Sequence, residues 1–469
     1  MRALMVSAMH SGAGKTVLVC ALMRALQRQG LLVAGFKCGP DYLDPLFHQR
    51  VLGMPSDNLD LFLQGDKGVR QTLALAGPMA DVGIVEGAMG FYDGVGGTHE
   101  ASAWELASRM GIPVVLAVRP AGSSLTLAAQ LRGVMAFREP SQISGVVLVD
   151  CKPALAAHLT PIIERTCDIP VLGYLPPMEE ASFASRHLGL VTAAEVPDFQ
   201  RRIDAMATTL SRTCDLNALV ALCGDIEEPT AAAVGPAPAG AARAGTDEAT
   251  GLAAPDQTTP TCRIAVASDE AFCFYYPAAL ARLRACGAQL VRFSPLRDAD
   301  LPSADALYLG GGYPELHATR LAANRGMRRS VQEAVLSGMP TVAECGGFMY
   351  LQQELVDERG TAHRMAAALP GSSAPAGRLV RFGYARLAAE DDSLLLRAGE
   401  RVPAHEFHHW DGTHNGQDLV AHKPSGRSWR CCHASPSLYA GYPHLHLAGE
   451  LPLAERLVAC ATTYGRHQE

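Results

Sequence analysis

The sequence contains no run of 18 or more consecutive apolar residues, which is the length that a membrane-spanning helix requires. It also lacks any C-x-x-C pair, although 13 cysteines are scattered along the chain. Disulfide frameworks and structural zinc sites both use regular cysteine spacings, so we expect neither. These absences predict a protein of the reducing cytoplasm that has no membrane span and whose thiols are mostly buried.

No long run of lysine or arginine occurs, and 40 basic residues are outnumbered by 47 acidic ones, which gives a net charge of −7. We therefore expect no broad surface for nucleic acid. An acidic substrate would need a locally basic pocket. The apolar stretch at the N-terminus is short and is interrupted by His10 and by glycines, so we do not expect a signal peptide.

A chain of 469 residues is too long for one ordinary hydrophobic core, so at least two domains are expected. Residues 228–261 are rich in Ala, Gly, Pro and Thr and contain almost no large apolar side chains, so they cannot bury a core. We predict a first domain at 1–222, a flexible linker at 223–261 and a second domain at 262–469. The alternative is a surface insertion within a single domain.

Short apolar runs alternate with helix-length segments in both predicted domains. Before the linker, these runs are RALMVSA, LLVAGFK, VGIVEG, IPVVLAV, ISGVVLVD and IPVLGYLP. After the linker, they are RIAVAS, AQLVRFSP, ALYLGGG and MPTVAEC. Such runs are typical of parallel strands that helices cover on both faces. The sequence therefore predicts an α/β fold with a parallel sheet in each domain.

The segment MHSGAGKT (9–16) follows the first apolar run and precedes a helix predicted over 15–29. It departs from the phosphate-loop pattern G-x-x-x-x-G-K-[ST] only at Met9, and a glycine-rich turn with a chance Lys-Thr is the alternative. In such a loop the backbone N–H groups surround phosphate oxygens, the lysine neutralises charge and the hydroxyl binds Mg²⁺. The predicted nucleotide-binding residues are Gly12, Ala13, Gly14, Lys15 and Thr16.

Two acidic segments follow other predicted strands, at the sheet edge where ligands bind in α/β folds. Residues 84–94 supply two carboxylates, and residues 36–48 supply a lysine, two carboxylates and a histidine. These residues are Glu86, Asp93, Lys37, Asp41, Asp44 and His48. A lysine and several carboxylates near a phosphate loop indicate phosphoryl transfer with a bound metal ion. The alternative for Asp41 and Asp44 is that they only cap a turn.

Cys345 follows a predicted strand and precedes Gly346 and Gly347, which is typical of a nucleophile on a tight strand-to-helix turn. Most cysteines are instead buried hydrophobes, and that is the alternative. The backbone N–H groups of Gly346 and of the glycine run at 310–312, including Gly311, could form an oxyanion hole. His444 and His446 alternate on a strand-like run, so only one of them can face the thiol as its base.

Taken in order, these motifs resemble those of the cobyrinate/hydrogenobyrinate a,c-diamide synthase family, over nearly the whole chain. The motifs are SGAGKT, FKCGPDYLDP, EGAMGFYDG, RHLGL, DEAFCFYYP, GGGYPELHA, ECGGFMYL, HEFHHW and YPHLHL. The resemblance implies an N-terminal P-loop synthetase domain like that of dethiobiotin synthetase. It also implies a C-terminal class I glutamine amidotransferase-like α/β domain. The family's reaction uses two ATP and two glutamines to amidate the a and c acetate side chains of a corrin ring.

By matching positions, the resemblance implies that Cys345 is the nucleophile and His444 its base, with His446 as the alternative. It implies that Lys37 stabilises the transferring phosphoryl group. The implied metal ligands are Thr16, Asp41 and Glu86. The residues expected to shape the corrinoid pocket or to help the ammonia step are Tyr42, Leu43, Asp44 and Asp93. Arg186 and His187 are expected, from their charge alone, to pair with substrate carboxylates.

Some features depart from the family pattern or leave alternatives open. The carboxylate usually found two residues after the base is absent, which indicates a Cys–His dyad. Hydrogenobyrinate or nickel-sirohydrochlorin could replace cobyrinate as the substrate, and a MinD-like ATP switch with a degenerate amidotransferase domain is an alternative of another class. The expected ligands are a corrinoid, glutamine, ATP and Mg²⁺, and the choice between monomer and homodimer stays open.

Overall fold

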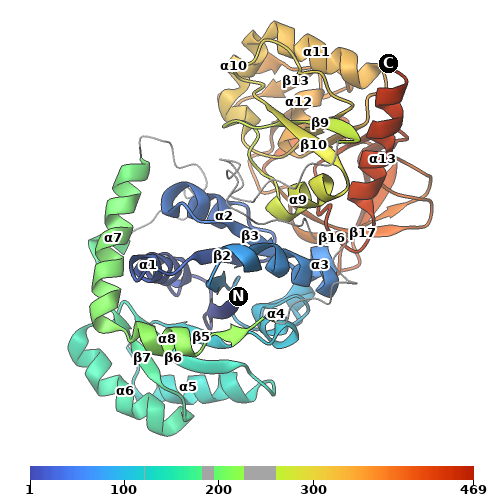
Figure 1. Ribbon diagram of the computed structural model, residues 1–469. Helices are drawn as coiled ribbons and strands as arrows, with labels where there is room; N and C mark the ends of the chain where they lie inside the picture. Colours follow the sequence, from blue (N-terminus) through green and yellow to red (C-terminus); the bar gives the residue numbers. More distant parts are fainter. Residues whose placement is uncertain (121, 182–194, 227–259, 469) are drawn as a thin grey trace. The chain divides into compact units, whose positions relative to one another are not determined.

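The computed structural model describes residues 1–120, 122–181, 195–226 and 260–468, and it divides into two compact units, Met1–Ala254 and Pro255–Glu469 (Figure 1). Each unit has its own sheets and its own hydrophobic clusters. Among the described residues, no helix is both long enough and apolar enough to cross a membrane.

The first unit is built on a parallel sheet with the strand order β3-β2-β4-β1-β5-β6-β7. Its short apolar strands are almost entirely buried, as expected when helices cover both faces of a parallel sheet. The strands are β1 (Arg2–Ser7), β2 (Val33–Cys38), β3 (Ser56–Leu59), β4 (Val82–Glu86), β5 (Val114–Val118), β6 (Ile143–Val149) and β7 (Val171–Leu175).

Alternate residues of β1 enter two different cores. Leu4 and Val6 belong to one cluster, which α1, α7 and α8 cover, whereas Ala3 and Met5 belong to a second cluster beneath α3, α4, α5 and α6. In Figure 1, α7 lies beside α1. The helices are α1 (Lys15–Arg28), α2 (Leu43–Phe47), α3 (Leu61–Ala76), α4 (Ala103–Met110), α5 (Leu125–Ala136), α6 (Pro153–Cys167), α7 (Val196–Thr213) and α8 (Leu216–Ala221).

Two features of this sheet differ from the expectation drawn from the sequence. The edge strand β3 has the polar sequence SDNL and was not among the predicted apolar runs. The short strand β8 (Gly224–Asp225) pairs antiparallel with β1, so the first unit extends beyond residue 222, where we expected the linker to begin. Residues 227–259 of the predicted linker lie outside the described residues.

The second unit is built on a sheet with the order β10-β9-β11-β12-β22-β21, in which only β21 is antiparallel. Its strands are β9 (Cys262–Ala267), β10 (Ala288–Phe293), β11 (Ala306–Leu309), β12 (Thr341–Glu344), β21 (His433–Ser435) and β22 (Leu438–Gly441). Its helices are α9 (Pro277–Ala285), α10 (Ala318–Ala323), α11 (Arg325–Leu336), α12 (Gly346–Leu351) and α13 (Leu453–Arg466).

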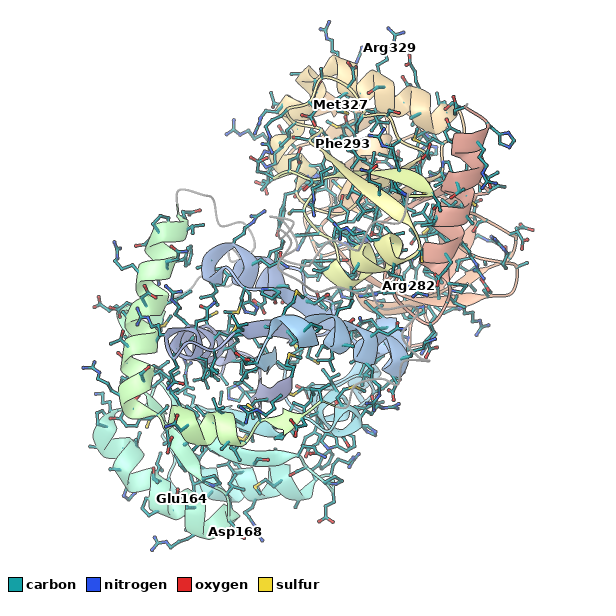
Figure 2. The ribbon with its side chains drawn as sticks, in the orientation of Figure 1. Glu164, Asp168, Arg282, Phe293, Met327 and Arg329 are labelled. Atoms are coloured by element: carbon teal, nitrogen blue, oxygen red, sulfur yellow. The ribbon has the colours of Figure 1, made fainter. Side chains whose placement is uncertain are left out.

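Helix α11 shows how amphipathic helices cover this sheet. Met327 is fully buried beneath the helix, and Figure 2 shows Arg329 projecting away from the unit. Met327 and Val331 are four residues apart and therefore lie on the same face of the helix. This spacing buries one face of the helix and leaves the other to solvent.

After α12, the chain forms two smaller sheets that the apolar-run pattern did not predict, and β23, which follows β22, completes the second of them. One has the order β14-β13-β15-β18, and the other has the order β20-β19-β16-β17-β23. The strands of the first are β13 (Glu354–Val356), β14 (Ala362–Arg364), β15 (Ser372–Pro375) and β18 (Trp410–Gly412). The strands of the second are β16 (Arg381–Ala389), β17 (Arg401–His408), β19 (Leu419–His422), β20 (Ser428–Cys431) and β23 (His444–Leu445).

We predict that Gly347→Ala strongly destabilises the second unit. A Cβ atom at this position would lie 2.1 Å from the carbonyl oxygen of Leu309, which is backbone and cannot move aside cheaply. Such overpacking should cost about 3 kcal/mol in the free energy of unfolding. Urea denaturation of the full chain measures this change, and an unaltered midpoint would contradict the proposed close packing of α12 on β11.

The matched control is the substitution Gly133→Ala. Gly133 lies in helix α5. No atom lies within 4 Å of a Cβ built at Gly133, and alanine favours a helix over glycine. This control should therefore raise the free energy of unfolding by about 0.5–1 kcal/mol.

Candidate functional site

The loop between β1 and α1 leaves the N-terminus of a helix open to an anion. Gly14 has φ +90° and caps α1 without a side-chain hydrogen bond. A Cβ atom on Gly14 would lie 2.7 Å from Val149 Cγ1, so both the backbone angle and the close approach to β6 require glycine. Gly12 also has a positive φ, of +76°. Free N–H groups and the helix dipole make this loop suited to phosphate.

Lys15 is buried at the start of α1, and its ammonium group is held by backbone oxygens. It donates to the carbonyl groups of His10 and Met89. Burial lowers the pKa of Lys15, and the nearby charge of Lys37 lowers it further. A bound phosphate would offer this ammonium group a charged partner that the carbonyls do not supply.

Lys37, Asp44 and Glu86 form a buried ionic cluster next to this loop. Lys37 Nζ lies 2.6 Å from Asp44 Oδ2 and 2.9 Å from Glu86 Oε1, and all three residues are at most 6% exposed. Thr16 Oγ1 donates a 2.6 Å hydrogen bond to the same Glu86 oxygen. The cluster therefore links the phosphate loop to the ends of β2 and β4.

The protonation of this cluster follows from burial and pairing. Burial acts to lower the pKa of Lys37, but the carboxylates of Asp44 and Glu86 outweigh it and raise that pKa well above its usual value. Burial raises the pKa of Glu86 to about 7, against the opposing charge of Lys37. Burial also acts to raise the pKa of Asp44, but Lys37 prevails and lowers it.

The residues at this site fit a magnesium ion. Glu86 Oε2 is buried and has no hydrogen-bond partner among the described residues, so one carboxylate oxygen is available beside the Thr16 hydroxyl. Mg²⁺ prefers such oxygen ligands and completes its shell with water and phosphate, so it needs few protein ligands. Elsewhere in the described chain, the histidines at 405–433 form no metal site, because no group of three or more His, Cys, Asp and Glu is arranged to hold an ion.

Asp41 lies beside Asp44 and acts on Lys37 of the ionic cluster, whereas Asp93 lies at the surface. Asp41 Oδ1 accepts a 2.8 Å hydrogen bond from Leu43 N, so it caps the turn before α2, and its pKa is raised by burial and by Asp44. Asp93 is exposed, and its Oδ2 accepts from Gly90 N at 2.9 Å. Tyr42 is buried and Leu43 half-buried in the same turn as Asp41. Arg186 and His187 lie outside the described residues.

Asn58, which no sequence motif singled out, uses its side-chain amide to hold the turn that contains Asp41 in place. Asn58 Nδ2 donates 2.8 Å hydrogen bonds to the carbonyl groups of Gly39 and Asp41. His48, which the sequence did single out, is fully buried and lies 3.0 Å from Ser56 Oγ through Nδ1. The run of polar residues SDNLD at 56–60, between two hydrophobic elements, is the signal that could have identified Asn58.

In the second unit, Cys345 lies on a strained turn between β12 and α12. Its φ is +48° and its ψ −101°, and its N–H donates a 2.7 Å hydrogen bond to Gly441 O. Strain of this kind in a residue other than glycine is typical of functional sites. A Cβ on Gly346 would lie 3.1 Å from Gly312 N, so the turn packs closely against the glycine run after β11.

The two candidate histidines lie in different surroundings. A Cβ on Gly311 would lie 2.5 Å from Cε1 and 3.3 Å from Nε2 of His444, so His444 faces the glycine run that borders the cysteine turn. His446 stacks instead on Tyr276, with ring centroids 4.5 Å apart. His444 therefore faces Gly311, and Gly346 lies against the adjacent Gly312, so the cysteine turn and His444 border the same glycine run, whereas His446 packs against Tyr276.

The resting cysteine and histidine are both neutral near pH 7. Desolvation raises the pKa of the Cys345 thiol to about 12, and the carboxylate of Glu315 adds to this effect. Burial lowers the pKa of His444 to about 3, assisted by His405 and His408. A neutral imidazole can accept a proton from a thiol, so deprotonation would accompany nucleophilic attack rather than precede it.

We predict that His446→Phe reduces the loss of stability in acid. Burial lowers the pKa of His446 to about 3, so below the ordinary value of 6.5 the unfolded chain binds a proton that the folded chain does not. The wild type thus loses stability as the pH falls from 6.5 toward 3. Between pH 7 and pH 5, the free energy of unfolding should therefore fall by about 2 kcal/mol less in the variant than in the wild type. Urea denaturation at both pH values measures the difference.

The control for this experiment is His467→Phe, because His467 is exposed near the C-terminus of the chain. It should leave the pH dependence of unfolding close to that of the wild type. A His446→Phe protein with the wild-type pH dependence would contradict the burial of a neutral imidazole.

Two family models match most of the chain. Residues 4–190 match the CobQ/CobB/MinD/ParA nucleotide binding domain, and residues 263–451 match the CobB/CobQ-like glutamine amidotransferase domain. The first match includes the phosphate loop and the ionic cluster, and the second includes Cys345 and His444.

Curated relatives resemble the chain along nearly its whole length. A cobyrinate a,c-diamide synthase of Salmonella typhimurium is 36% identical over 460 residues, which cover 96% of each protein. A cobyrinate a,c-diamide synthase of Streptococcus sanguinis is 36% identical and covers 95% of this chain and 96% of its own, and one of Clostridium tetani is 32% identical and covers 98% and 100%. The chain therefore belongs to the cobyrinate a,c-diamide synthase family, in which a nucleotide-binding domain precedes a glutamine amidotransferase domain.

Proposed function

We propose that the protein uses ATP and glutamine to amidate the a and c acetate carboxylates of cobyrinate, as a cytoplasmic enzyme of cobalamin biosynthesis. The observation that supports this proposal is that one chain has both a phosphate loop joined to a buried Lys37–Glu86 pair and a strained cysteine on a turn whose neighbouring glycine run faces a neutral histidine. The names of the relatives supply the substrate.

The chemistry explains why one enzyme would need both sites. A carboxylate is a poor electrophile, because its negative charge repels a nucleophile and oxide is a poor leaving group. Transfer of the γ-phosphoryl group of ATP to a carboxylate oxygen gives an acyl phosphate and ADP. Ammonia then attacks the carbonyl carbon, inorganic phosphate leaves, and an amide forms. Two such cycles give the diamide.

In the first unit, the proposed roles follow from the contacts. Gly12, Gly14 and Lys15 hold the phosphates through backbone N–H groups and an ammonium charge, and Ala13 lies between the glycines. Thr16 and Glu86 hold Mg²⁺, which neutralises charge on the phosphates when it is bound. Because Asp41 caps a turn, we propose that it supports the metal site from nearby.

Lys37 would stabilise the γ-phosphoryl group during its transfer. Its charge is secured by Asp44 and Glu86, so it stays protonated in a buried position. The turn that contains Tyr42, Leu43 and Asp44 follows the end of β2 and would contribute to the corrinoid pocket. Asp93 is exposed at the same edge of the sheet and would help to bind the corrinoid or to guide ammonia.

In the second unit, Cys345 would attack the side-chain amide of glutamine. The thiol proton passes to His444, the C–S bond forms, and the proton then leaves with the nitrogen as ammonia. Backbone N–H groups of Gly311 and Gly346 would bind the oxyanion of the tetrahedral intermediate. Water hydrolyses the thioester to glutamate. Ammonia passes to the acyl phosphate within the protein, where it is not lost to protonation in solvent.

The substrate itself can be tested directly. Purified protein is incubated with ATP, glutamine and, separately, cobyrinate, hydrogenobyrinate or nickel-sirohydrochlorin, and the products are measured by mass spectrometry. We expect two amide substitutions on cobyrinate. If only hydrogenobyrinate or only nickel-sirohydrochlorin were amidated, that compound would be the substrate in place of cobyrinate. If none of the three tetrapyrroles were amidated, the proposed activity would be contradicted.

We predict that Cys345→Ser abolishes glutamine-dependent amidation and retains amidation with ammonium chloride. The serine hydroxyl is a much weaker nucleophile, whereas the first unit is unchanged. The measurement is diamide formation with each nitrogen source. If a folded variant lost both activities, glutamine cleavage and amidation would not be separate functions of two sites.

We predict that Lys15→Ala abolishes amidation with both nitrogen sources, because the acyl phosphate would no longer form. ADP release and diamide formation are measured together, and circular dichroism confirms that the variant is folded. Retained amidation without ADP release would remove ATP activation from the scheme.

A further inference from the structure

Glu344 is the last residue of β12 and directly precedes the proposed nucleophile, and its side chain is almost completely buried. Its Oε1 accepts a 2.8 Å hydrogen bond from Leu445 N, and its Oε2 accepts a 3.0 Å hydrogen bond from Tyr308 Oη. One carboxylate therefore ties the nucleophile strand to β11, which leads into the glycine run, and to β23, which carries His444.

The same carboxylate lies beside the proposed base. Glu344 Oε2 is 3.8 Å from Nδ1 of His444, whereas Cε1 and Nε2 of this imidazole face Gly311. A proton on Nδ1 would then point toward a carboxylate, and Nε2 is the nitrogen that would accept the thiol proton. Because 3.8 Å exceeds hydrogen-bond distance, Glu344 acts on His444 through its charge and through the bond to Leu445.

We propose that Glu344 is the positioning residue of the Cys345–His444 pair, which the sequence presented as a dyad. It fixes the strand that carries His444, and in its ionised form it stabilises the imidazolium that exists between deprotonation of the thiol and release of ammonia. This inference rests on the proposed glutamine cleavage. In amidotransferases with a triad, a carboxylate is sought two residues after the base, but Leu445 and His446 follow His444 here.

The surroundings of Glu344 favour a protonation change near neutral pH. Burial raises its pKa to about 7. The hydrogen bonds from Leu445 N and Tyr308 act against this effect, and the titratable groups around the Glu344 carboxylate are Tyr275, Tyr308, Cys345, Tyr439 and His444. The tyrosines and the cysteine have raised pKa values and stay neutral at pH 7, and the pKa of His444 lies far below 7.

Two further carboxyl groups act on the cysteine from other elements and could also contribute to a pH profile. The pKa values of Glu315 and Glu406 are each raised to about 7 by burial. A pH profile must therefore be assigned to Glu344 by mutation rather than by its midpoint alone.

The main test is Glu344→Gln in the full chain, assayed for glutamate release from glutamine with ATP and cobyrinate present, at pH 5.5–9. We expect the glutamine-dependent kcat to fall about 100-fold, because a charge about 4 Å from the imidazolium is lost. The rise in kcat around pH 7 should disappear, while the KM for glutamine and ammonia-dependent amidation should stay near wild type. A wild-type kcat and pH profile would overturn the inference.

A second variant distinguishes an effect on catalysis from a loss of folded structure. Tyr308→Phe removes one hydrogen bond that favours the ionised form of Glu344, so the midpoint of the pH profile should move upward while the kcat at high pH is retained. Loss of a purely structural contact would lower the yield of folded protein without moving this midpoint. An unmoved midpoint in folded Tyr308→Phe would overturn the inference even if Glu344→Gln failed to fold.

Failure of this inference can be told apart from failure of the proposed function. If the wild type releases no glutamate from glutamine under any condition, the proposed function fails. If Cys345→Ser is inactive with glutamine and Glu344→Gln behaves as the wild type, only the role of Glu344 fails. Glu315→Gln, tested alongside, should keep the pH midpoint of the wild type; if it removed the midpoint, Glu315 rather than Glu344 would be the titrating group.

Discussion

The sharp turn from the end of a parallel strand into a helix is the constraint on which both sites of this protein depend. After β1, Gly14 takes a positive φ and approaches β6 so closely that no side chain fits. After β12, Cys345 itself takes the positive φ, and Gly346 and Gly347 allow the following helix to lie on the end of β11. In both units, the turn exposes backbone N–H groups at a helix N-terminus, which suits phosphate in one case and an oxyanion in the other.

The two sites treat buried charge differently. In the first unit, Lys37 is paired with Asp44 and Glu86, so a positive charge persists inside the protein. In the second unit, Glu344 accepts hydrogen bonds from Tyr308 and from the backbone N–H of Leu445, and it lies beside a neutral histidine. A permanent charge suits the binding of a phosphoryl group, whereas a carboxyl that titrates near neutral pH suits a site where protons move.

The sequence predicted the parts of the fold that have strong local signals. The buried parallel strands, the phosphate loop and the cysteine turn were expected from apolar runs and glycines, and they are present. The polar strand β3 and the two small sheets were missed, because their strands are short or have no continuous apolar run. Glu344 was missed because its role depends on β23, which follows it by about a hundred residues and reaches it only through folding.

The central claim is that one chain activates a carboxylate with ATP and obtains the nitrogen from glutamine. The most direct measurement uses glutamine labelled with ¹⁵N in its side-chain amide, together with cobyrinate and ATP and without added ammonium salt, followed by mass spectrometry of the product and counting of ADP. The account predicts two ¹⁵N atoms and two ADP for each molecule of diamide. Unlabelled diamide, or diamide formed without ADP, would contradict it.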